Sequence, residues 1–301
     1  MQEKRPIGVF DLTARCPLRC QHCYMNLDLR RCKDLPDALF LQRLKQRIKA
    51  YDLRSAFWVG GEPLLRPKLL LAAMSLLSRN AVATSGTVPI PPGLTDIAGL
   101  LVSVEGPQPL HDALRGPGTY EKTRSRLSSL RKQSFALSTT LCRQNVGAVE
   151  ALPKLNDELN SLGVLVGFFV GPKGSPLRVE GDERNRAIDR LLDLKQRHPN
   201  VLLNTAESIA RFAGKQDMSE VCIYKHSAIA FDHRLKEKQP CTFGSEADCS
   251  LCGCPVVALQ VSRRDGEKES LSVLRQLFPK RSGEKQTTVW EATAHGGAKD
   301  Q

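Results

Sequence analysis

Three cysteines near the N-terminus have a spacing that favours metal chemistry. Cys16, Cys20 and Cys23 lie within the segment LTARCPLRCQHCYM. A helix could carry them as a small buried stripe, but the proline after the first cysteine and the polar flanks favour a loop. Zinc could bind the three thiolates with His22 as the fourth ligand. A [4Fe–4S] cluster explains the short looped spacing better, since each thiolate would hold one iron and the fourth iron would stay open.

A second group of cysteines lies near the C-terminus. Cys241, Cys249, Cys252 and Cys254 occur in the segment CTFGSEADCSLCGCP. Four thiolates complete one metal centre and leave no open position, so zinc and an iron–sulfur cluster both fit this set. Because Cys252 and Cys254 are closely spaced, Cys222 is a reserve ligand in case one of that pair does not bind.

The composition is that of a globular, water-soluble protein. The chain has 301 residues, of which 41% are hydrophobic, and no apolar run approaches the ~20 residues that span a bilayer. The N-terminal sequence MQEKRPIGVF lacks the apolar stretch and cleavage site of a signal peptide, so we expect a cytoplasmic protein. In that reducing compartment the cysteines are not expected to form disulfides.

The net charge of +12 is unevenly distributed. Between Arg115 and Arg143, lysines and arginines are opposed by a single acid, Glu121. Such a run is most simply a solvated helix face, and alternatively a docking patch for an acidic partner. Aromatic residues make up only 5% of the chain, which argues against a surface that tracks nucleic acid.

Apolar runs of strand length alternate with segments of helical period, which predicts a parallel α/β array. Expected strands cover residues 7–12, 55–60, 81–86, 100–105, 135–141 and 164–171. Expected helices cover residues 36–50, 66–79, 119–132, 147–162 and 182–197. Six units are fewer than the eight that close a full barrel, so we predict a partial (β/α)6 barrel with its ligands at the carboxyl ends of the strands.

The pattern changes in the last third of the chain. Residues 228–241 predict a hairpin that leads into the second cysteine group. From Ser262 onward the chain is polar, and a short amphipathic helix is expected over 271–278. We therefore predict three parts, namely a core over residues 1–200, a small cysteine-bearing extension over 201–261 and a polar tail over 262–301.

Several strand-end segments together resemble the radical S-adenosylmethionine (SAM) superfamily. The first is the C-x3-C-x2-C motif followed by Tyr24. The others are GGEPLL (60–65), TSGT (84–87), SVEGP (103–107), LHDALRGPGTYEKT (110–123) and STTLCRQN (138–145). Each alone is an ordinary strand-end turn, whereas their order at successive strand ends is typical of this superfamily.

The resemblance implies a cofactor site. Cys16, Cys20 and Cys23 would hold a [4Fe–4S] cluster whose open iron chelates SAM, and one electron would cleave SAM to a 5′-deoxyadenosyl radical that modifies an unactivated carbon. The resemblance assigns no catalytic side chain. The implied SAM contacts are Tyr24, Gly60, Gly61, Glu62, Thr84, Ser85, Ser103, Glu105, Ser138 and Arg143, with Glu62 at the amino group and Ser138 and Arg143 at the carboxylate.

The hairpin and its cysteines also resemble the SPASM/twitch extensions of radical SAM enzymes, which favours an auxiliary iron–sulfur cluster over zinc at the second group. The chain departs from that pattern because Asp232, His233 and Arg234 replace the usual turn glycine. The extension is also short, so we do not expect two auxiliary clusters. The family implies flavodoxin or ferredoxin as the electron donor.

Three functions compete. The 103–123 segment and the twitch-like tail resemble peptide-modifying enzymes, so a peptide or protein substrate is the first choice. The segment over 180–214 resembles hopanoid adenosyltransferases, which makes a lipid or small molecule the alternative, with adenosyl addition as its reaction. A metal-stapled module that binds nucleic acid is the third, and it leaves the strand-end motifs without a purpose.

Overall fold

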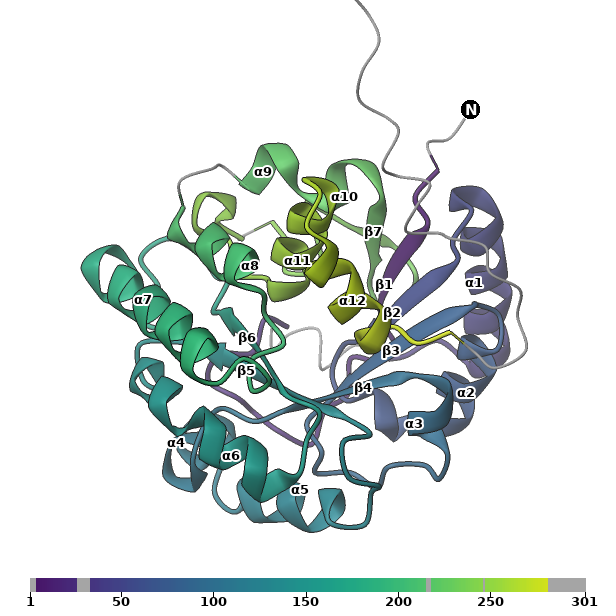
Figure 1. Ribbon diagram of the computed structural model, residues 1–301. Coiled ribbons are helices and arrows are strands. Elements are labelled where there is room, and N and C mark those ends of the chain that lie inside the picture. The colour runs from purple at the N-terminus through teal and green to yellow at the C-terminus, as the bar shows by residue number, and fades with distance from the viewer. Residues whose placement is uncertain (1–3, 26–32, 215–217, 246, 281–301) are drawn as a thin grey trace, which may run out of the picture.

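Eight strands form one open and mostly parallel sheet. The computed structural model describes residues 4–25, 33–214, 218–245 and 247–280. The strands are β1 (Ile7–Asp11), β2 (Ser55–Val59), β3 (Arg79–Thr84), β4 (Gly99–Ser103), β5 (Ala136–Leu141), β6 (Val164–Phe168), β7 (Ala228–Phe231) and β8 (Glu237–Lys238). Their order is β6-β5-β4-β3-β2-β1-β7-β8, and each neighbouring pair is parallel except β7 and β8. Because β6 and β8 end this order and do not pair with each other, the sheet does not close, which confirms the partial barrel (Figure 1).

The predicted hairpin is present and belongs to this sheet. β7 runs parallel to β1 with Phe231 opposite Phe10, and β8 returns antiparallel with Glu237 opposite Phe231. The rings of Phe10 and Phe231 stack with their centroids 5.2 Å apart, and Trp58 also stacks on Phe10 at 4.9 Å. The C-terminal cysteine segment therefore starts from an edge of the core sheet.

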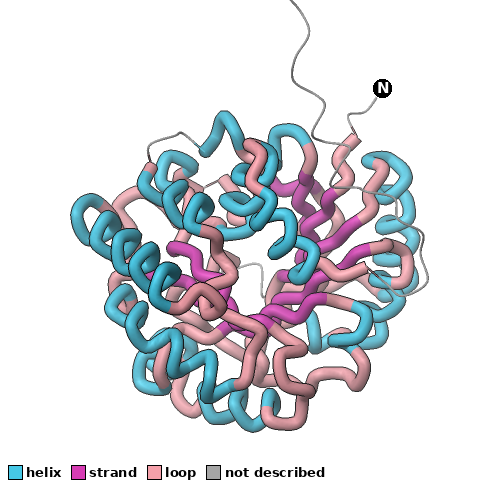
Figure 2. Tube along the Cα trace, viewed as in Figure 1, coloured by secondary structure: helices cyan, strands magenta, loops and turns pink. Residues whose placement is uncertain are grey.

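Helices surround the strands on the outside (Figure 2). The helices are α1 (Asp37–Tyr51), α2 (Pro67–Met74), α3 (Leu94–Ile97), α4 (Gln108–Arg115), α5 (Thr119–Leu127), α6 (Leu152–Leu159), α7 (Gly181–Arg197), α8 (Ala206–Ala210), α9 (Met218–Val221), α10 (Ile223–His226), α11 (Pro255–Arg264) and α12 (Lys268–Leu277). Outward strand residues such as Ala56, Trp58 and Val82 are fully buried and form the main core with Phe40 and Leu44 of α1. Because successive side chains of a strand point to opposite faces of the sheet, the remaining strand residues lie on the inner face, which other elements must cover.

The inner face of the sheet is covered by the last two helices. Ile7 and Leu101 of the strands belong to one apolar cluster with Phe278, which follows α12. A Cβ on Gly99 would lie 1.9 Å from the carbonyl oxygen of Leu277, so a glycine is required where α12 approaches β4. The C-terminal helices thus complete the barrel interior.

This packing corrects the expectation of a polar tail in its described part. The helix expected over 271–278 is present as α12, which begins at Lys268, whereas α11 has no counterpart among the expected helices. α11 is buried over residues 257–262 because β6 lies on one side of it and α8 and α12 on others. Residues 281–301 of the expected tail lie outside the described residues.

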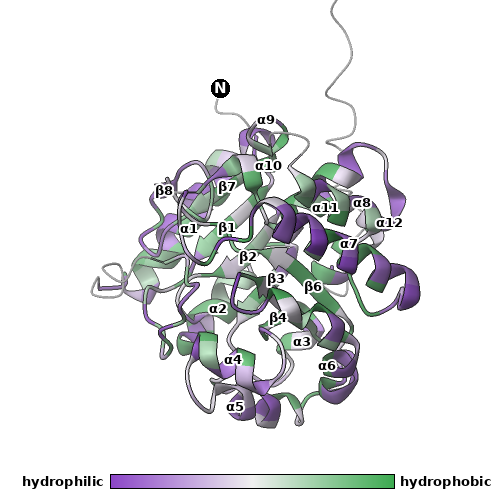
Figure 3. Ribbon diagram, turned by 90° about the vertical axis from the view of Figure 1, so that its left-hand side faces the viewer, coloured by the Kyte–Doolittle hydropathy of each residue, from purple (hydrophilic) through white to green (hydrophobic). Residues whose placement is uncertain are grey.

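Hydropathy follows the same division. In Figure 3 the strands are mostly hydrophobic, and hydrophilic stretches lie on the outer helices α5, α6 and α7. Continuous apolar runs are expected for parallel strands that are buried on both faces. Within the described ranges, the helices include none with the length and apolar character needed to cross a bilayer.

Candidate active site and second cysteine site

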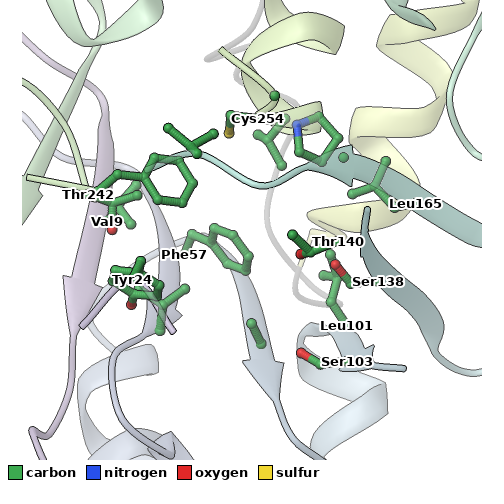
Figure 4. A pocket seen from close by; sticks show the side chains of 18 of the residues that line it. Val9, Tyr24, Phe57, Leu101, Ser103, Ser138, Thr140, Leu165, Thr242 and Cys254 are labelled. Carbon is green, nitrogen blue, oxygen red and sulfur yellow. The ribbon is translucent and has the colours of Figure 1, made fainter. Parts of the chain in front are cut away.

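A cavity of about 260 Å³, here called the first cavity, lies where the inner face of the sheet meets the N-terminal cysteine loop. Figure 4 shows strand residues such as Phe57, Leu101 and Ser138 directed into it. Its lining includes Cys16, Cys20 and Cys23, here called the first site, and the expected SAM contacts Tyr24, Gly60, Gly61, Thr84, Ser85, Ser103 and Ser138. The fold therefore brings the three thiols and most of the strand-end residues to one place.

The two glycines after β2 hold the cysteine loop against the sheet. The N–H of Gly61 donates to the carbonyl of Thr13 at 2.8 Å. A Cβ on Gly61 would lie 2.1 Å from the carbonyl oxygen of Arg15, and a Cβ on Gly60 would lie 2.8 Å from that of Thr13. The expected close approach is thus present, and its described partner is the loop that carries the thiols.

Glu62 does not line the first cavity. The residue is 1% exposed, and its carboxylate accepts hydrogen bonds from the Thr84 hydroxyl at 2.8 Å and from the Ser85 hydroxyl at 2.7 Å. It also accepts the N–H of Leu64 at 3.1 Å. The carboxylate therefore ties the end of β2 to the end of β3, and contact with a SAM amino group would require these bonds to rearrange.

Glu105 also lies outside the cavity lining, at the centre of a buried charge network. Its carboxylate contacts the guanidinium of Arg115 at 2.8 and 2.5 Å, Nε2 of His22 at 3.1 Å and the N–H of Thr140 at 2.8 Å. Nη1 of Arg115 lies 3.9 Å from Sγ of Cys20. The network thus connects the end of β4 and the end of α4 with the first site.

Charge and burial set the protonation of this network. Burial favours the neutral form of Glu105, but Arg115 and His22 favour the ionised form more strongly, so the pKa of Glu105 is held well below its usual range. Burial lowers the pKa of His111 to about 4, and Arg115 acts in the same direction. At neutral pH, Glu105 is therefore an anion and His111 a neutral base.

Arg115 and His22 line the first cavity and were not among the expected SAM contacts. Nδ1 of His22 is buried and has no hydrogen-bond partner among the residues that the structure describes. The sequence suggested His22 only as a zinc ligand. The sequence signal that could have identified Arg115 is its position in the LHDALRG segment, one of the segments that resemble the radical SAM superfamily.

Tyr24 joins three parts of the site. Its hydroxyl donates to Asp11 at 2.9 Å and accepts the N–H of Gly60 at 3.0 Å. Lys238 of β8 bonds the same carboxylate at 2.8 Å and lies 5.0 Å from the centroid of the Tyr24 ring. Burial raises the pKa of Asp11 and that of Tyr24, and the carboxyl group adds to the shift of the phenol. The hairpin is therefore coupled to the end of β1 and to the cysteine loop.

Arg143 lies away from the first cavity. Its side chain is 56% exposed and pairs with Glu183 of α7 at 3.5 Å. Ser103 and Ser138 line the cavity as expected, together with the guanidinium of Arg115. Arg143 is therefore not among the lining residues, and its expected role at the SAM carboxylate stays a prediction.

A second cavity, of about 340 Å³, adjoins the first. Its lining includes Cys222, Cys241, Cys249, Cys252 and Cys254, here called the second site. Both cavities are lined by Val170, Tyr224, Phe243, Cys254 and Val257, so they share a wall. The fold brings together the second cysteine group and its reserve ligand, one thiol more than a four-ligand centre uses.

Two buried arginines anchor the segment that carries the second site. The guanidinium of the buried Arg178 pairs with the partly buried Asp248 at 2.9 Å. The guanidinium of Arg184 donates to the carbonyl of Cys252 at 3.3 Å, and burial lowers its pKa to about 10. The backbone of the second site is thus held by the chain itself.

Two glycines allow the same segment to contact the end of β6. The N–H of Phe168 donates to the carbonyl of Gly253 at 3.0 Å. A Cβ on Gly253 would lie 2.3 Å from the Phe168 oxygen, and a Cβ on Gly167 would lie 2.6 Å from the Gly253 oxygen. This contact sets Cys254 on the wall between the cavities (Figure 4).

The donor sets suit iron–sulfur chemistry at both sites. Burial raises the pKa of Cys254 to about 12 and that of Cys222 to about 11, so these thiols require a metal to ionise at neutral pH. In the described part of the chain, no three His, Cys, Asp or Glu side chains converge closely enough to hold one metal ion.

Cys142, after β5, is fully buried, and Cys32 lies outside the described residues. His111 is fully buried in α4, where Nδ1 accepts the N–H of Glu105 at 3.3 Å.

Comparisons with known proteins show which family model and which proteins this chain is similar to. Residues 11–142 match the radical SAM superfamily. The chain is 28% identical over 169 residues to the pre-heme d1 synthase of Dinoroseobacter shibae, which covers 51% of this chain and 41% of that protein. It is 28% identical over 213 residues to the Fe-coproporphyrin III synthase of Methanosarcina barkeri, which covers 64% of this chain and 52% of that protein. The chain thus spans about half the length of the curated relatives it matches.

Solved structures share the fold. Native anSMEcpe with bound AdoMet and the Cp18Cys peptide has a TM-score of 0.61 at 14% identity, over 89% of this chain and 82% of that one. SuiB of Streptococcus suis, bound to the precursor peptide SuiA, has a TM-score of 0.56 at 14% identity, over 77% of this chain and 58% of that one. The superfamily implies a [4Fe–4S] cluster and SAM. The strand-end motifs and the match over residues 11–142 thus point to the radical SAM superfamily, and both curated relatives are named as synthases.

Proposed function

We propose that this enzyme holds a [4Fe–4S] cluster on the first site, binds SAM along the strand ends and modifies a small apolar molecule. The first cavity carries the proposal, because the same cavity is lined by the three thiols, the polar strand ends and the apolar inner sheet. When bound, the cluster supplies the electron that cleaves SAM to a 5′-deoxyadenosyl radical.

The polar lining of the first cavity supports the SAM part of the proposal. Ser103 and Ser138 place hydroxyl groups at paired positions on neighbouring strands, and Nδ1 of His22 is buried without a partner among the described residues. Arg115 is bonded to Glu105 and also lines the cavity. We infer that its guanidinium binds the SAM carboxylate while Glu105 holds it in place.

The apolar lining supports the substrate part. Phe57, Leu101, Leu165 and Val256 line the cavity, and among its described lining residues Arg115 alone is a lysine or arginine. A small molecule with little charge suits such a wall. The expected peptide or protein substrate gains no support from the two curated relatives, because their names refer to heme d1 and coproporphyrin III. Those names make a porphyrin the second candidate.

SAM cleavage tests the core of the proposal. Anaerobically reconstituted protein with SAM and dithionite should form 5′-deoxyadenosine, measured by liquid chromatography. Addition of SAM should also change the electron paramagnetic resonance signal of the reduced cluster. A cluster that neither responds to SAM nor cleaves it would refute the proposal.

Mass spectrometry separates the substrate candidates. The enzyme is incubated with an apolar lipid extract, with Fe-coproporphyrin III or with a tryptic peptide mixture, each with and without SAM. Hydrogen abstraction releases free 5′-deoxyadenosine, whereas adenosyl addition gives a product heavier by the adenosyl group. A SAM-dependent change of the coproporphyrin alone would favour the porphyrin, and a change of peptides alone would restore the peptide candidate.

We propose further that the second site holds an auxiliary iron–sulfur cluster. Its support is the set of five thiols around one cavity and the buried arginines that anchor their segment. With the radical SAM core over residues 1–200, the extension would run from residue 201 through Lys280, because α11 and α12 pack on the same sheet. Iron and zinc quantification tests this assignment.

The electron donor would be a flavodoxin or ferredoxin that meets the basic run near α5. Arg124 is paired there with Glu121 at 2.8 Å, whereas Arg126 and Arg131 are exposed. Reversal of Arg126 and Arg131 to glutamate should slow flavodoxin-driven turnover and leave dithionite-driven turnover unchanged. Equal slowing of both reactions would exclude docking at this surface.

A further inference from the structure

Gln260 of α11 is a buried amide whose nitrogen has no hydrogen-bond partner in the described part of the chain. The residue is 2% exposed and lines the first cavity, and its Nε2 atom has no partner among the described residues. The other buried side-chain amides in that part of the chain, those of Asn80, Asn145 and Asn204, each accept through oxygen and donate through nitrogen. Gln260 therefore differs from the other buried side-chain amides described, because its nitrogen donates no hydrogen bond within the described part of the protein.

An amide of this kind lowers stability, because it gives up hydrogen bonds to bulk water on folding and no described group of the protein replaces the one at Nε2. A methionine would occupy a similar volume between Leu259 and Val261 without this penalty. Elsewhere on α11, the buried hydroxyl of Ser262 accepts the Nε–H of Arg211 at 2.7 Å. The hydroxyl of Ser262 thus has a partner within the protein, whereas the Gln260 amide borders the cavity with its nitrogen unpaired among the described residues.

We infer that Gln260 determines substrate specificity by donating a hydrogen bond from Nε2 to a neutral carbonyl oxygen of the apolar substrate. This inference rests on the proposed binding of substrate in the first cavity. It adds to that proposal the functional group that the substrate must carry.

The surroundings of Gln260 select a neutral group over a charged one. Leu259, its neighbour on α11, belongs to the apolar cluster with Ile7, Leu101 and Phe278. Arg115, the cation that lines the cavity, is bonded into the network behind the cysteine loop. A carboxylate beside Gln260 would be buried without a counter-charge, which is far more costly than burial of a ketone, amide or ester carbonyl.

Three probes with one ring system test the inference. They are 2-acetylnaphthalene, 2-ethylnaphthalene and 2-naphthoate, titrated by calorimetry into the reconstituted full-length protein with SAM and without reductant. Wild type should bind the ketone about tenfold more tightly than the hydrocarbon, the size of one neutral hydrogen bond. It should also bind the ketone more tightly than the carboxylate. Gln260→Met should bind the ketone and the hydrocarbon equally.

Leu101→Met is the matched control, because it changes the shape of the cavity wall without changing its polarity, and it should keep the preference for the ketone. Without probes, Gln260→Met should raise the midpoint of thermal unfolding. A lower midpoint, an unchanged preference in Gln260→Met, no preference in wild type or tighter binding of 2-naphthoate would each overturn the inference. If wild type cleaves SAM but shows no ketone preference, only the role of Gln260 fails. If it does not cleave SAM, the proposed function fails first.

Discussion

The two cysteine sites of this chain have contrasting surroundings. The first site has three thiols, and a network of Arg115, Glu105 and His22 lies behind it. The second site has five thiols around a separate cavity, and its wall toward the first cavity includes Val170 and Val257. A site one ligand short of a full set, with polar groups nearby, suits the capture of a polar cofactor. A site with a surplus of thiols suits a centre that is never released.

The strongest test of this contrast removes each set of thiols in turn. Alanine at all three cysteines of the first site should abolish 5′-deoxyadenosine formation, because the proposed cluster has no other described ligands there. Alanine at Cys241, Cys249, Cys252 and Cys254 should remove about four irons from the second site, as expected for one cubane cluster. The loss of one zinc instead would assign zinc to the second site. Deoxyadenosine formation by the first variant would contradict the contrast.

Each buried arginine should affect only the cysteine site that it adjoins, Arg115 the first site and Arg178 the second. Arg115→Met leaves the Glu105 carboxylate buried beside His22 without its guanidinium, so we expect a loss of about 3–5 kcal/mol in the free energy of unfolding, measured with denaturant. Arg178→Met is the matched variant, because it removes the buried partner of Asp248. Iron analysis should show loss from the first site in Arg115→Met and from the second in Arg178→Met. Loss from both sites in both variants would show that the sites are not independent.

The pH dependence of stability should report on the network behind the first site. The folded pKa of His111 is about 4 and its ordinary value is 6.5, so the unfolded chain binds the proton more readily between these values. Stability from this residue is therefore full above pH 6.5 and is lost as the pH falls toward 4, on the order of 3 kcal/mol in total. His111→Gln should flatten the unfolding profile over that window, whereas His226→Gln on the exposed surface should not.

The smallest expected effect concerns the backbone of the second site. Gly253→Ala places a Cβ against the Phe168 carbonyl, so the segment must shift, at a cost of about 1–3 kcal/mol. Gly147→Ala is the control, since a Cβ there meets nothing within 4 Å. Gly253→Ala should lower the iron content of the second site and leave the SAM response of the first unchanged. Equal iron content in both variants would mean that this contact does not hold the second site.

Local sequence signals were sufficient for the sheet and for both groups of cysteines. Continuous apolar runs marked the six strands of the core to within two residues at their starts, because parallel strands are buried on both faces. The spacing of Cys16, Cys20 and Cys23 marked a loop at a strand end. These features depend only on residues that are close along the chain. The order of the motifs along the chain then indicated the superfamily that the sequence resembles.

The polar contacts of the site could not be predicted in this way. Glu62 and Glu105 stand in matched motifs, yet both are bonded inside the protein because Thr84 and Arg115 are brought to them by other strands and helices. Arg143 was chosen for its position at a strand end, but Glu183 holds it outside. That Nε2 of Gln260 has no hydrogen-bond partner among the described residues can be recognised only from the three-dimensional packing around α11.

The cover of the inner sheet by α11 and α12 has a consequence for synthesis. Ribosomes release the N-terminal part of a chain first, so every strand is available before residues 255–280 emerge. Until then the face that carries Ile7 and Leu101 has no cover and presents a broad apolar surface to any neighbouring chain. A premature stop just before Pro255 should therefore yield protein that aggregates despite carrying all the described cysteines, and the last two helices act as the closing step of assembly.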